Sequence, residues 1–135
     1  MEDYQIAFFQ RHIDTDILLC QLCKPERRIG AMHFGGLTIE CQIKAIICNT
    51  LPGGMMQNLK THSYIELLGH HNKLNSRFDK FREARKWLDQ VENPMGQHFI
   101  DIRYSGVDPS EENYKHWLHA YKSIKAWLQK QADQL

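Results

Sequence analysis

The stretch HFGGLTIECQIKAIICNTLPGG, residues 33–54, decides the fold that the sequence predicts. Its apolar residues fall on more than one side of a helix, and the closing LPGG is a strong stop signal. A helix that is apolar nearly all round belongs at the centre of a helical bundle. Proline suits the first turn of a helix, so we expect this central helix to begin at Pro25 and to run to about Asn49.

Two charged residues interrupt the apolar surface of this helix. Glu40 and Lys44 are four residues apart with the acid first, which is the better orientation for an ion pair on a helix. At about 100° per residue, His33 lies within about 20° of each of them around the helix axis. This narrow polar stripe either faces solvent, where an ion pair contributes little stability, or lines a groove or subunit interface.

A pair of glycines, Gly35 and Gly36, stands inside the same predicted helix. Each costs about 1 kcal/mol relative to alanine in a helix interior. We expect the close approach of a neighbouring helix to compensate this cost. The Gly-rich fingerprint of a phosphate-binding loop is missing, so the pair does not indicate such a loop.

The rest of the sequence predicts further helices. One pattern covers residues 4–23, and Thr61, Ser76 and Asp108 are suited to cap three later helices. Strand-like alternation is confined to HFIDIRY, residues 98–104. We therefore expect one all-α domain over residues 1–135, an up-and-down bundle of four long helices with one or two short extra helices.

Composition excludes several classes of protein. The chain of 135 residues is 42% hydrophobic and 24% charged, which is ordinary for a globular domain. Its formal net charge of +1 does not indicate nucleic-acid binding by bulk charge. No apolar run is long enough to span a membrane, and MEDYQ does not begin like a secretion signal. We expect a cytoplasmic protein without a membrane partner.

Cysteines and histidines do not form a recognisable metal or redox motif. Cys20 and Cys23 form a C-x-x-C sequence, but it lies inside a helical pattern, where small core residues are the better interpretation. Neither the adjacent His70 and His71 nor any other histidine spacing matches a zinc motif. We expect no metal and no cofactor. Trp127 lies off the main apolar stripe of the last helix and is our candidate for a dimer contact.

The segment HFGGLTIECQIKAII, followed by THSYIELL, resembles the HEPN domain, a small helical domain associated with nucleotides and RNA. The similar features are the signature from Glu40 to Ala45, the histidine His62 that opens the next helix, and IRYSGVDPSEENY before the last helix. The resemblance covers about residues 14–130. It implies a four- to five-helix bundle, commonly a homodimer with a cleft between the subunits.

Many HEPN domains are metal-independent ribonucleases with an arginine four to six residues before a histidine. Here only His33 follows an arginine at that spacing, either Arg28 or Arg27. On one continuous helix, Arg28 and His33 would be about 140° apart and would not share a face. Other HEPN domains only bind ligands, or act as partners of a nucleotidyltransferase-like protein.

We therefore expect a nucleotide- or RNA-binding module without catalysis. The resemblance places its site in a cleft at a dimer interface, lined by His33, Glu40, Lys44, Arg103 and Tyr104. One alternative is a metal-independent ribonuclease of the toxin or defence type that uses Arg28 and His33. A second alternative is a structural module that pairs with a nucleotidyltransferase-like protein.

Overall fold

A computed structural model describes residues 3–20, 27–51 and 59–135, and every regular element within these ranges is a helix. The long helices are α1 (Tyr4–Cys20), α2 (Arg28–Thr50) and α6 (Glu111–Gln134). The shorter elements are α3 (Tyr64–Leu68), α4 (Asn72–Lys80), α5 (Arg82–Glu92) and two 3₁₀ helices, η3 (Pro94–Gly96) and η4 (Ile102–Tyr104). The prediction of an all-α fold is confirmed.

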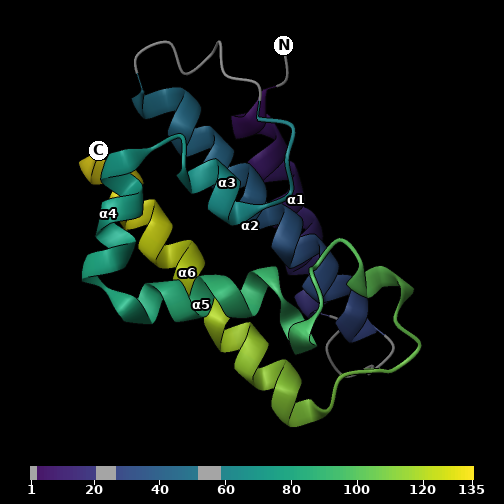
Figure 1. Cartoon of the computed structure of the whole chain (residues 1–135). Coiled ribbons are helices and arrows are strands. Elements are labelled where there is room, and N and C mark those ends of the chain that lie inside the picture. The colour runs from purple at the N-terminus through teal and green to yellow at the C-terminus, as the bar shows by residue number, and fades with distance from the viewer. Residues whose placement is uncertain (1–2, 21–26, 52–58) are drawn as a thin grey trace.

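Helix α2 is the central element, as its sequence predicts. It contacts α1, α3, α5, α6 and η4, and in Figure 1 it lies between α6 and an antiparallel α1. It begins at Arg28 and ends at Thr50, one residue beyond the predicted end. Pro25, Cys23 and most of the LPGG stop signal lie outside the described residues.

One hydrophobic core joins α2 to the second half of the chain. Ile39, Ile43 and Ile47 of α2 are fully buried, together with Tyr64 from α3 and Tyr121 from α6. In the described part of the chain, no helix is both long enough and apolar enough to cross a lipid bilayer.

The two glycines of α2 allow close approach, but to different kinds of element. A Cβ atom built on Gly35 would lie 2.5 Å from Cζ2 of Trp117 in α6, so a helix packs there as predicted. Gly36 faces the ring of Phe99. Phe99 belongs to the loop between η3 and η4, so the prediction of a neighbouring helix is wrong for this second glycine.

The helix predicted to start at Ser76 is in fact two helices. The chain breaks at Phe81, where φ is −127° and ψ is 85°, and this break separates α4 from α5. Ser76 lies inside α4 and does not cap it. His71 is the cap, because its Nδ1 accepts a hydrogen bond from the Leu74 amide at 3.1 Å. Histidine is not among the preferred N-cap residues, so sequence rules miss it.

Two other predicted caps are displaced by two residues. The Ser63 hydroxyl accepts the Glu66 amide of α3, whereas Thr61 accepts the amide of Ser63 before the helix begins. At α6 the cap is Ser110, whose hydroxyl accepts the Asn113 amide at 3.1 Å, and not Asp108. Each chosen cap lies directly before the first helical residue, as the geometry of a side-chain cap requires.

The strand-like segment 98–104 forms turns. Apart from the Phe99 amide, which bonds to the Glu92 carbonyl at 2.8 Å, its backbone bonds join near neighbours, with the Asp101 amide on the His98 carbonyl at 2.9 Å and the Tyr104 amide on the Asp101 carbonyl at 3.1 Å. Alternation in this segment therefore does not indicate a strand.

Trp127 packs within its own chain. Its ring lies 4.5 Å from that of Phe78 and 6.4 Å from that of Phe81, measured between centroids. The break at Phe81 turns these two aromatic side chains toward α6. Trp127 therefore has partners within the chain, although it lies off the main apolar stripe of α6.

Candidate functional site

The Glu40–Lys44 pair is buried, so the interpretation of a solvent-facing stripe is wrong. The Lys44 ammonium lies 2.9 Å from Oε2 of Glu40, and the two side chains are only 8% and 5% exposed. A third residue completes the group, since Nδ1 of His62 lies 2.6 Å from Oε1 of the same carboxylate. The His62 side chain is 57% exposed and connects this buried pair to the surface.

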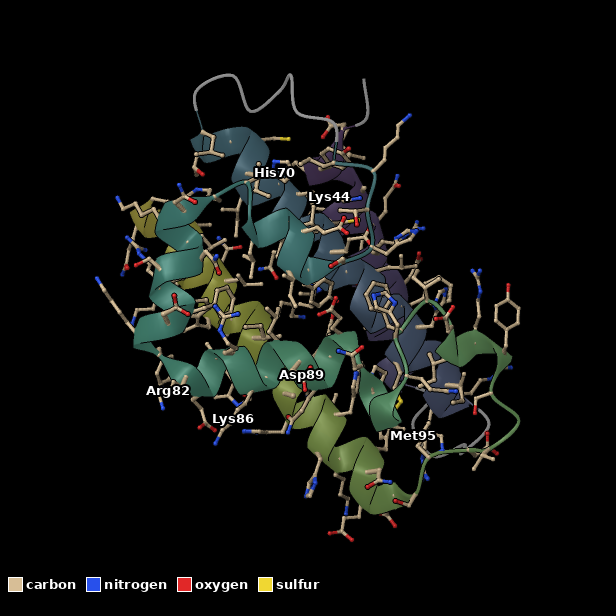
Figure 2. The ribbon with its side chains drawn as sticks, in the orientation of Figure 1. Lys44, His70, Arg82, Lys86, Asp89 and Met95 are labelled. Carbon is tan, nitrogen blue, oxygen red and sulfur yellow. The ribbon has the colours of Figure 1, made fainter. Side chains whose placement is uncertain are left out.

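Neighbouring elements hold these side chains in place. Lys44 lies 5.2 Å from the ring centroid of Tyr4 in α1, a cation–π contact that helps to compensate its burial. Leu59 is fully buried and anchors the segment that leads to α3. Ser63 then caps α3, which fixes the position of His62 one residue before the cap. Figure 2 shows Lys44 on α2, while Arg82 and Lys86 project from α5.

The contact with Glu40 determines which His62 nitrogen is available. Nδ1 donates its proton to the carboxylate, so Nε2 is the nitrogen left to meet a ligand or to move a proton. An imidazole held in this way can contact a polar ligand or take part in proton transfer through Nε2.

His98 joins the 97–104 segment to His62. Its Nε2 donates to the His62 carbonyl at 2.9 Å, and its Nδ1 accepts the Ile100 amide at 3.1 Å. Beneath it, Glu92 accepts the Tyr64 amide at 2.9 Å. Burial raises the pKa of the Glu92 carboxyl group, while the Tyr64 amide and the nearby His98 act in the opposite direction.

Arg28 and His33, the two candidates for catalysis, bind different parts of the chain. The His33 Nδ1 donates to the Phe99 carbonyl at 2.9 Å. The Arg28 guanidinium donates to the Pro109 carbonyl at 3.0 Å and lies 5.7 Å from the Tyr114 ring centroid. No interaction among the described residues joins Arg28 to His33. Each has a clear structural role, fastening a loop or the start of α6 to α2.

Arg103 and Tyr104 form an exposed pair on η4. The Arg103 guanidinium lies 4.8 Å from the Tyr104 ring centroid, and Tyr104 is 76% exposed. Ile102 is fully buried and holds η4 against α2. The pair thus presents a flat aromatic ring and a fixed positive charge on a firmly packed turn.

The 97–104 segment carries or contacts each of these groups, and we treat the surface around it as one candidate site. At one end His98 bonds to His62, in the middle Phe99 bonds to His33, and at the other end stand the two exposed residues of η4. We call this surface the 97–104 face and define it by five residues: His33, His62, His98, Arg103 and Tyr104. The sequence predicted three of these residues, and Glu40 and Lys44 lie beneath the fourth, His62.

Sequence reasoning did not select His62, His98 or Glu92 as site residues. His62 meets Glu40 across 22 positions of sequence, and no local spacing carries that information. The sequence did contain two signals. His62 lies at the start of a short predicted helix, and Glu40 is an acidic residue on a central helix that is otherwise mostly apolar. Among the described residues, no group of three histidine, cysteine or acidic side chains could hold a metal ion.

Comparisons of the chain with known protein families, with curated proteins and with solved structures give no match. The HEPN resemblance therefore stays a prediction from sequence motifs. The geometry of the 97–104 face is the basis on which a function can be assigned to the chain.

Proposed function

We propose that this chain is a HEPN-like module that binds a nucleotide or single-stranded RNA on the 97–104 face, without cleaving it. The observation that carries the proposal is that one short segment, residues 97–104, connects two kinds of group. His62 offers an imidazole backed by a buried carboxylate, and the η4 turn offers a cation stacked on an exposed ring.

The His62 end is suited to a phosphate group. Glu40 and Lys44 neutralise each other below the surface, so the side chain exposed at this end is the His62 imidazole. A protonated imidazole donates from Nε2 to a phosphate oxygen, and such charge-assisted hydrogen bonds are about twice as strong as neutral ones.

The η4 end is suited to a base and its phosphate. Exposed aromatic rings stack on nucleobases without sequence preference, at about 1–3 kcal/mol per base. The Arg103 guanidinium beside Tyr104 can bind phosphate through two parallel hydrogen bonds. Aromatic rings and cations together are the usual means of binding single-stranded nucleic acid.

The test measures binding of a short fluorescent single-stranded RNA by anisotropy at several salt concentrations. We expect weak binding that falls as salt rises, because the contacts with phosphate release counterions. Tyr104→Ala should weaken binding by about tenfold, and Arg103→Ala should also reduce the salt dependence. Arg82→Ala, an exposed arginine on α5, is the matched control and should leave binding unchanged.

Three outcomes would contradict this function. Binding that is unchanged in both η4 variants would remove the 97–104 face from the interaction. The same RNA incubated with EDTA tests the ribonuclease alternative, and cleavage that disappears in His33→Ala would favour catalysis. If no RNA or nucleotide binds, the partner module of a nucleotidyltransferase-like protein becomes the better interpretation.

The proposal includes a homodimer of HEPN-type up-and-down bundles. We treat α4 and α5 together as the third long helix of that bundle, interrupted at Phe81. For the dimer contact we select an exposed apolar stripe on α1, formed by Ile6, Phe9 and Ile13, which are 54%, 54% and 57% exposed. Residues three and four apart on a helix form one surface, and such a stripe can pack against its own copy.

Light scattering after size exclusion tests the dimer directly. Phe9→Asp should convert a dimer to a monomer, because it places a charge in the middle of the apolar stripe. Ile65→Asp is the matched control, since Ile65 is 73% exposed on α3 and lies on a different element. A wild-type chain that is monomeric at high concentration would contradict this part of the proposal.

A further inference from the structure

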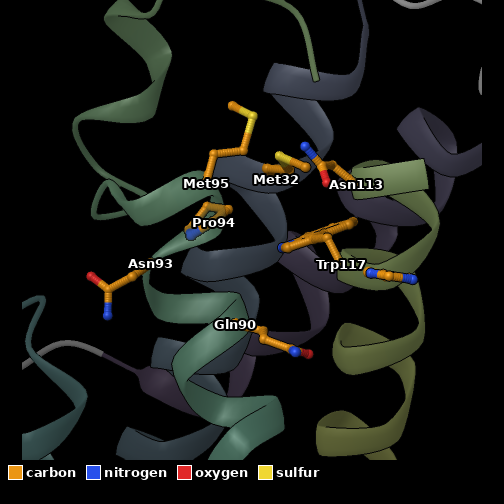
Figure 3. Close-up of a pocket in the computed structure, with 8 residues that line it drawn as sticks. Met32, Gln90, Asn93, Pro94, Met95, Asn113 and Trp117 are labelled. Atoms are coloured by element: carbon orange, nitrogen blue, oxygen red, sulfur yellow. The ribbon is translucent and has the colours of Figure 1, made fainter. Parts of the chain in front are cut away.

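A small pocket lies between α2, α5, η3 and α6, and none of its residues belongs to the 97–104 face (Figure 3). Its volume is about 190 Å³. The lining combines the thioethers of Met32 and Met95 with the indole of Trp117 and the carboxamides of Gln90 and Asn113. These side chains come from four different elements, so only the tertiary fold assembles them.

The pocket contains a hydrogen-bond donor without a partner. Trp117 is only 3% exposed, and its Nε1 has no hydrogen-bond partner. In Figure 3 the nitrogen end of this indole points from α6 toward Pro94 and α5. A buried N–H group without a partner costs free energy, which a ligand acceptor in the pocket would recover.

Contacts with three neighbouring residues hold the Trp117 indole in place. One face stacks on Tyr121, with centroids 5.3 Å apart and an angle of 12°, and Tyr114 lies 5.7 Å away along the same helix. Gly35 packs against the benzene side of the ring. These contacts hold the indole rigidly, so its N–H direction is fixed before any ligand arrives.

The lining chemistry selects an uncharged, flat ligand. None of the eight lining residues is Asp, Glu, Lys or Arg, so the site offers no fixed charge to a phosphate or a carboxylate. Carboxamides present a donor beside an acceptor, which matches the edge of a nucleobase. Methionine thioethers pack favourably on aromatic rings. The volume lies below the range of about 300–1,000 Å³ typical of drug-sized ligands, so it suits a single ring system.

We propose that this pocket binds an uncharged nitrogen heterocycle of nucleobase size, edge-on to Trp117, with a ring nitrogen or carbonyl accepting the Nε1 proton. Gln90 and Asn113 bond to the remaining polar edge, and the two methionines cover the ring. The inference does not rest on the proposed RNA binding, because the two sites share no residue.

Met95 lines the pocket from an unusual backbone conformation. Its φ of 55° and ψ of 29° lie in the left-handed region, and its side chain is 40% exposed. Glycine adopts this conformation without strain. Met95→Gly therefore removes the thioether from the pocket while the fold keeps or gains stability, which separates binding from folding.

The experiment follows the indole N–H signals of ¹⁵N-labelled protein during titration with adenine. The chain has three tryptophans, and Trp117→Phe identifies the signal of Trp117. We expect this signal to move and saturate at millimolar adenine or below, while those of Trp87 and Trp127 stay in place. Inorganic phosphate, as the charged probe, should leave the Trp117 signal unchanged.

Variants then test the lining. Met95→Gly and Asn113→Ala should each weaken adenine binding by about threefold to tenfold, the loss expected for one hydrogen bond or one packing contact. Gln129→Ala, an exposed carboxamide further along α6, is the matched control and should bind as the wild type does. These surface variants decide the question even if Trp117→Phe does not fold.

The proposal is overturned if adenine leaves the Trp117 signal unmoved, or if Met95→Gly and Asn113→Ala bind as tightly as Gln129→Ala. RNA binding is measured on the same variants as a separate readout. If Met95→Gly loses adenine binding but keeps RNA binding, the two sites are independent. If adenine fails while RNA still binds, only the pocket inference falls.

Discussion

The Lys44 ammonium lies 2.9 Å from a Glu40 carboxylate oxygen, and both side chains are more than nine-tenths buried. The carboxylate also accepts the Nδ1 proton of His62 at 2.6 Å, so each of its oxygens has a partner. Burial of a charge is tolerated only when such partners replace water. The central helix therefore carries a charged group that its neighbours must complete.

Removal of one member of this pair should be strongly destabilising. Lys44→Met leaves the Glu40 carboxylate buried with only His62 as its partner, and we expect a loss of about 3–5 kcal/mol in the free energy of unfolding. The double variant Glu40→Leu/Lys44→Met should recover a large part of that loss. Urea unfolding of the wild type, both single variants and the double variant measures the coupling. Strictly additive losses would contradict a direct interaction.

A methyl group at Gly35 should disturb the contact between α2 and α6. The built Cβ lies 2.5 Å from Cζ2 and 2.8 Å from Cη2 of Trp117, so the indole or the helix has to move. We expect Gly35→Ala to lower the free energy of unfolding by about 1–3 kcal/mol, the usual cost of overpacking, although alanine favours helix. Thermal unfolding checks this prediction.

Gly106→Ala is the matched control for that variant. A Cβ built on Gly106 meets nothing within 4 Å, and the residue lies outside the helices. Its melting temperature should stay close to that of the wild type. Equal effects of the two alanine substitutions would show that the contact with Trp117 is unimportant.

Substitution of the two candidate caps of α6 distinguishes the observed cap from the predicted one. Ser110→Ala removes the acceptor of the Asn113 amide and should cost about 1 kcal/mol. Asp108→Ala should change stability by less than about 0.5 kcal/mol, since Asp108 is exposed and lies before the cap. Denaturant unfolding of both variants provides the comparison, and a larger effect at Asp108 would move the cap to that residue.

His71 should make stability depend on pH. Burial is the main cause that lowers its pKa from 6.5, against its own backbone hydrogen bond, which raises it. Its Nδ1 accepts the Leu74 amide and its Nε2 lies 2.8 Å from the Thr50 hydroxyl oxygen, so the neutral ring fits the fold. Below pH 6.5 the unfolded chain takes up a proton at this residue before the folded chain does. The contribution of His71 is therefore complete above pH 6.5 and is lost as the pH falls.

The variant His71→Asn isolates this effect, because asparagine can still cap α4 but does not titrate. The free energy of unfolding of the wild type minus that of His71→Asn should decrease as the pH is lowered from about 7.5 to about 5.5. Subtracting the variant is necessary because Glu92 also makes stability depend on pH. Burial raises the pKa of Glu92, so the stability that Glu92 contributes is lost as the pH rises above 4.5, which is opposite to the effect of His71. A difference that does not change with pH would contradict the assigned role of His71.

Local patterns in the sequence predicted most of the helices. Apolar residues on more than one side of residues 33–50 identified the central helix. The sequence also places Tyr114, Trp117, Leu118, Tyr121, Ile124 and Leu128 on one stripe of the last helix, and all of these except the partly exposed Leu118 are buried. The ion pair of Glu40 and Lys44 is also local, because four residues form one turn of helix. Each of these properties depends on neighbours within a few positions, so a single sequence is sufficient to predict it.

Other features depend on contacts that no local pattern contains. The break at Phe81 occurs inside an apolar repeat that would fit one continuous helix, and it allows Phe78 and Phe81 to pack against Trp127. The alternation in residues 98–104 is typical of a strand, but no strand lies beside it among the described residues, and Phe99 and Ile102 pack on α2 instead. In both cases the burial of large side chains outweighs the local preference.

The sequence alone therefore determined an all-α fold around one central helix and the presence of a charged pair on it. Only the tertiary structure decided that this pair is buried, that His62 carries it to the surface, and that Arg28 and His33 fasten separate segments. It also decided that an unpaired Trp117 nitrogen faces a small pocket. The physical reason is the range of the interactions: helix formation is set by neighbours along the chain, whereas burial and partner choice are set by residues brought together by packing.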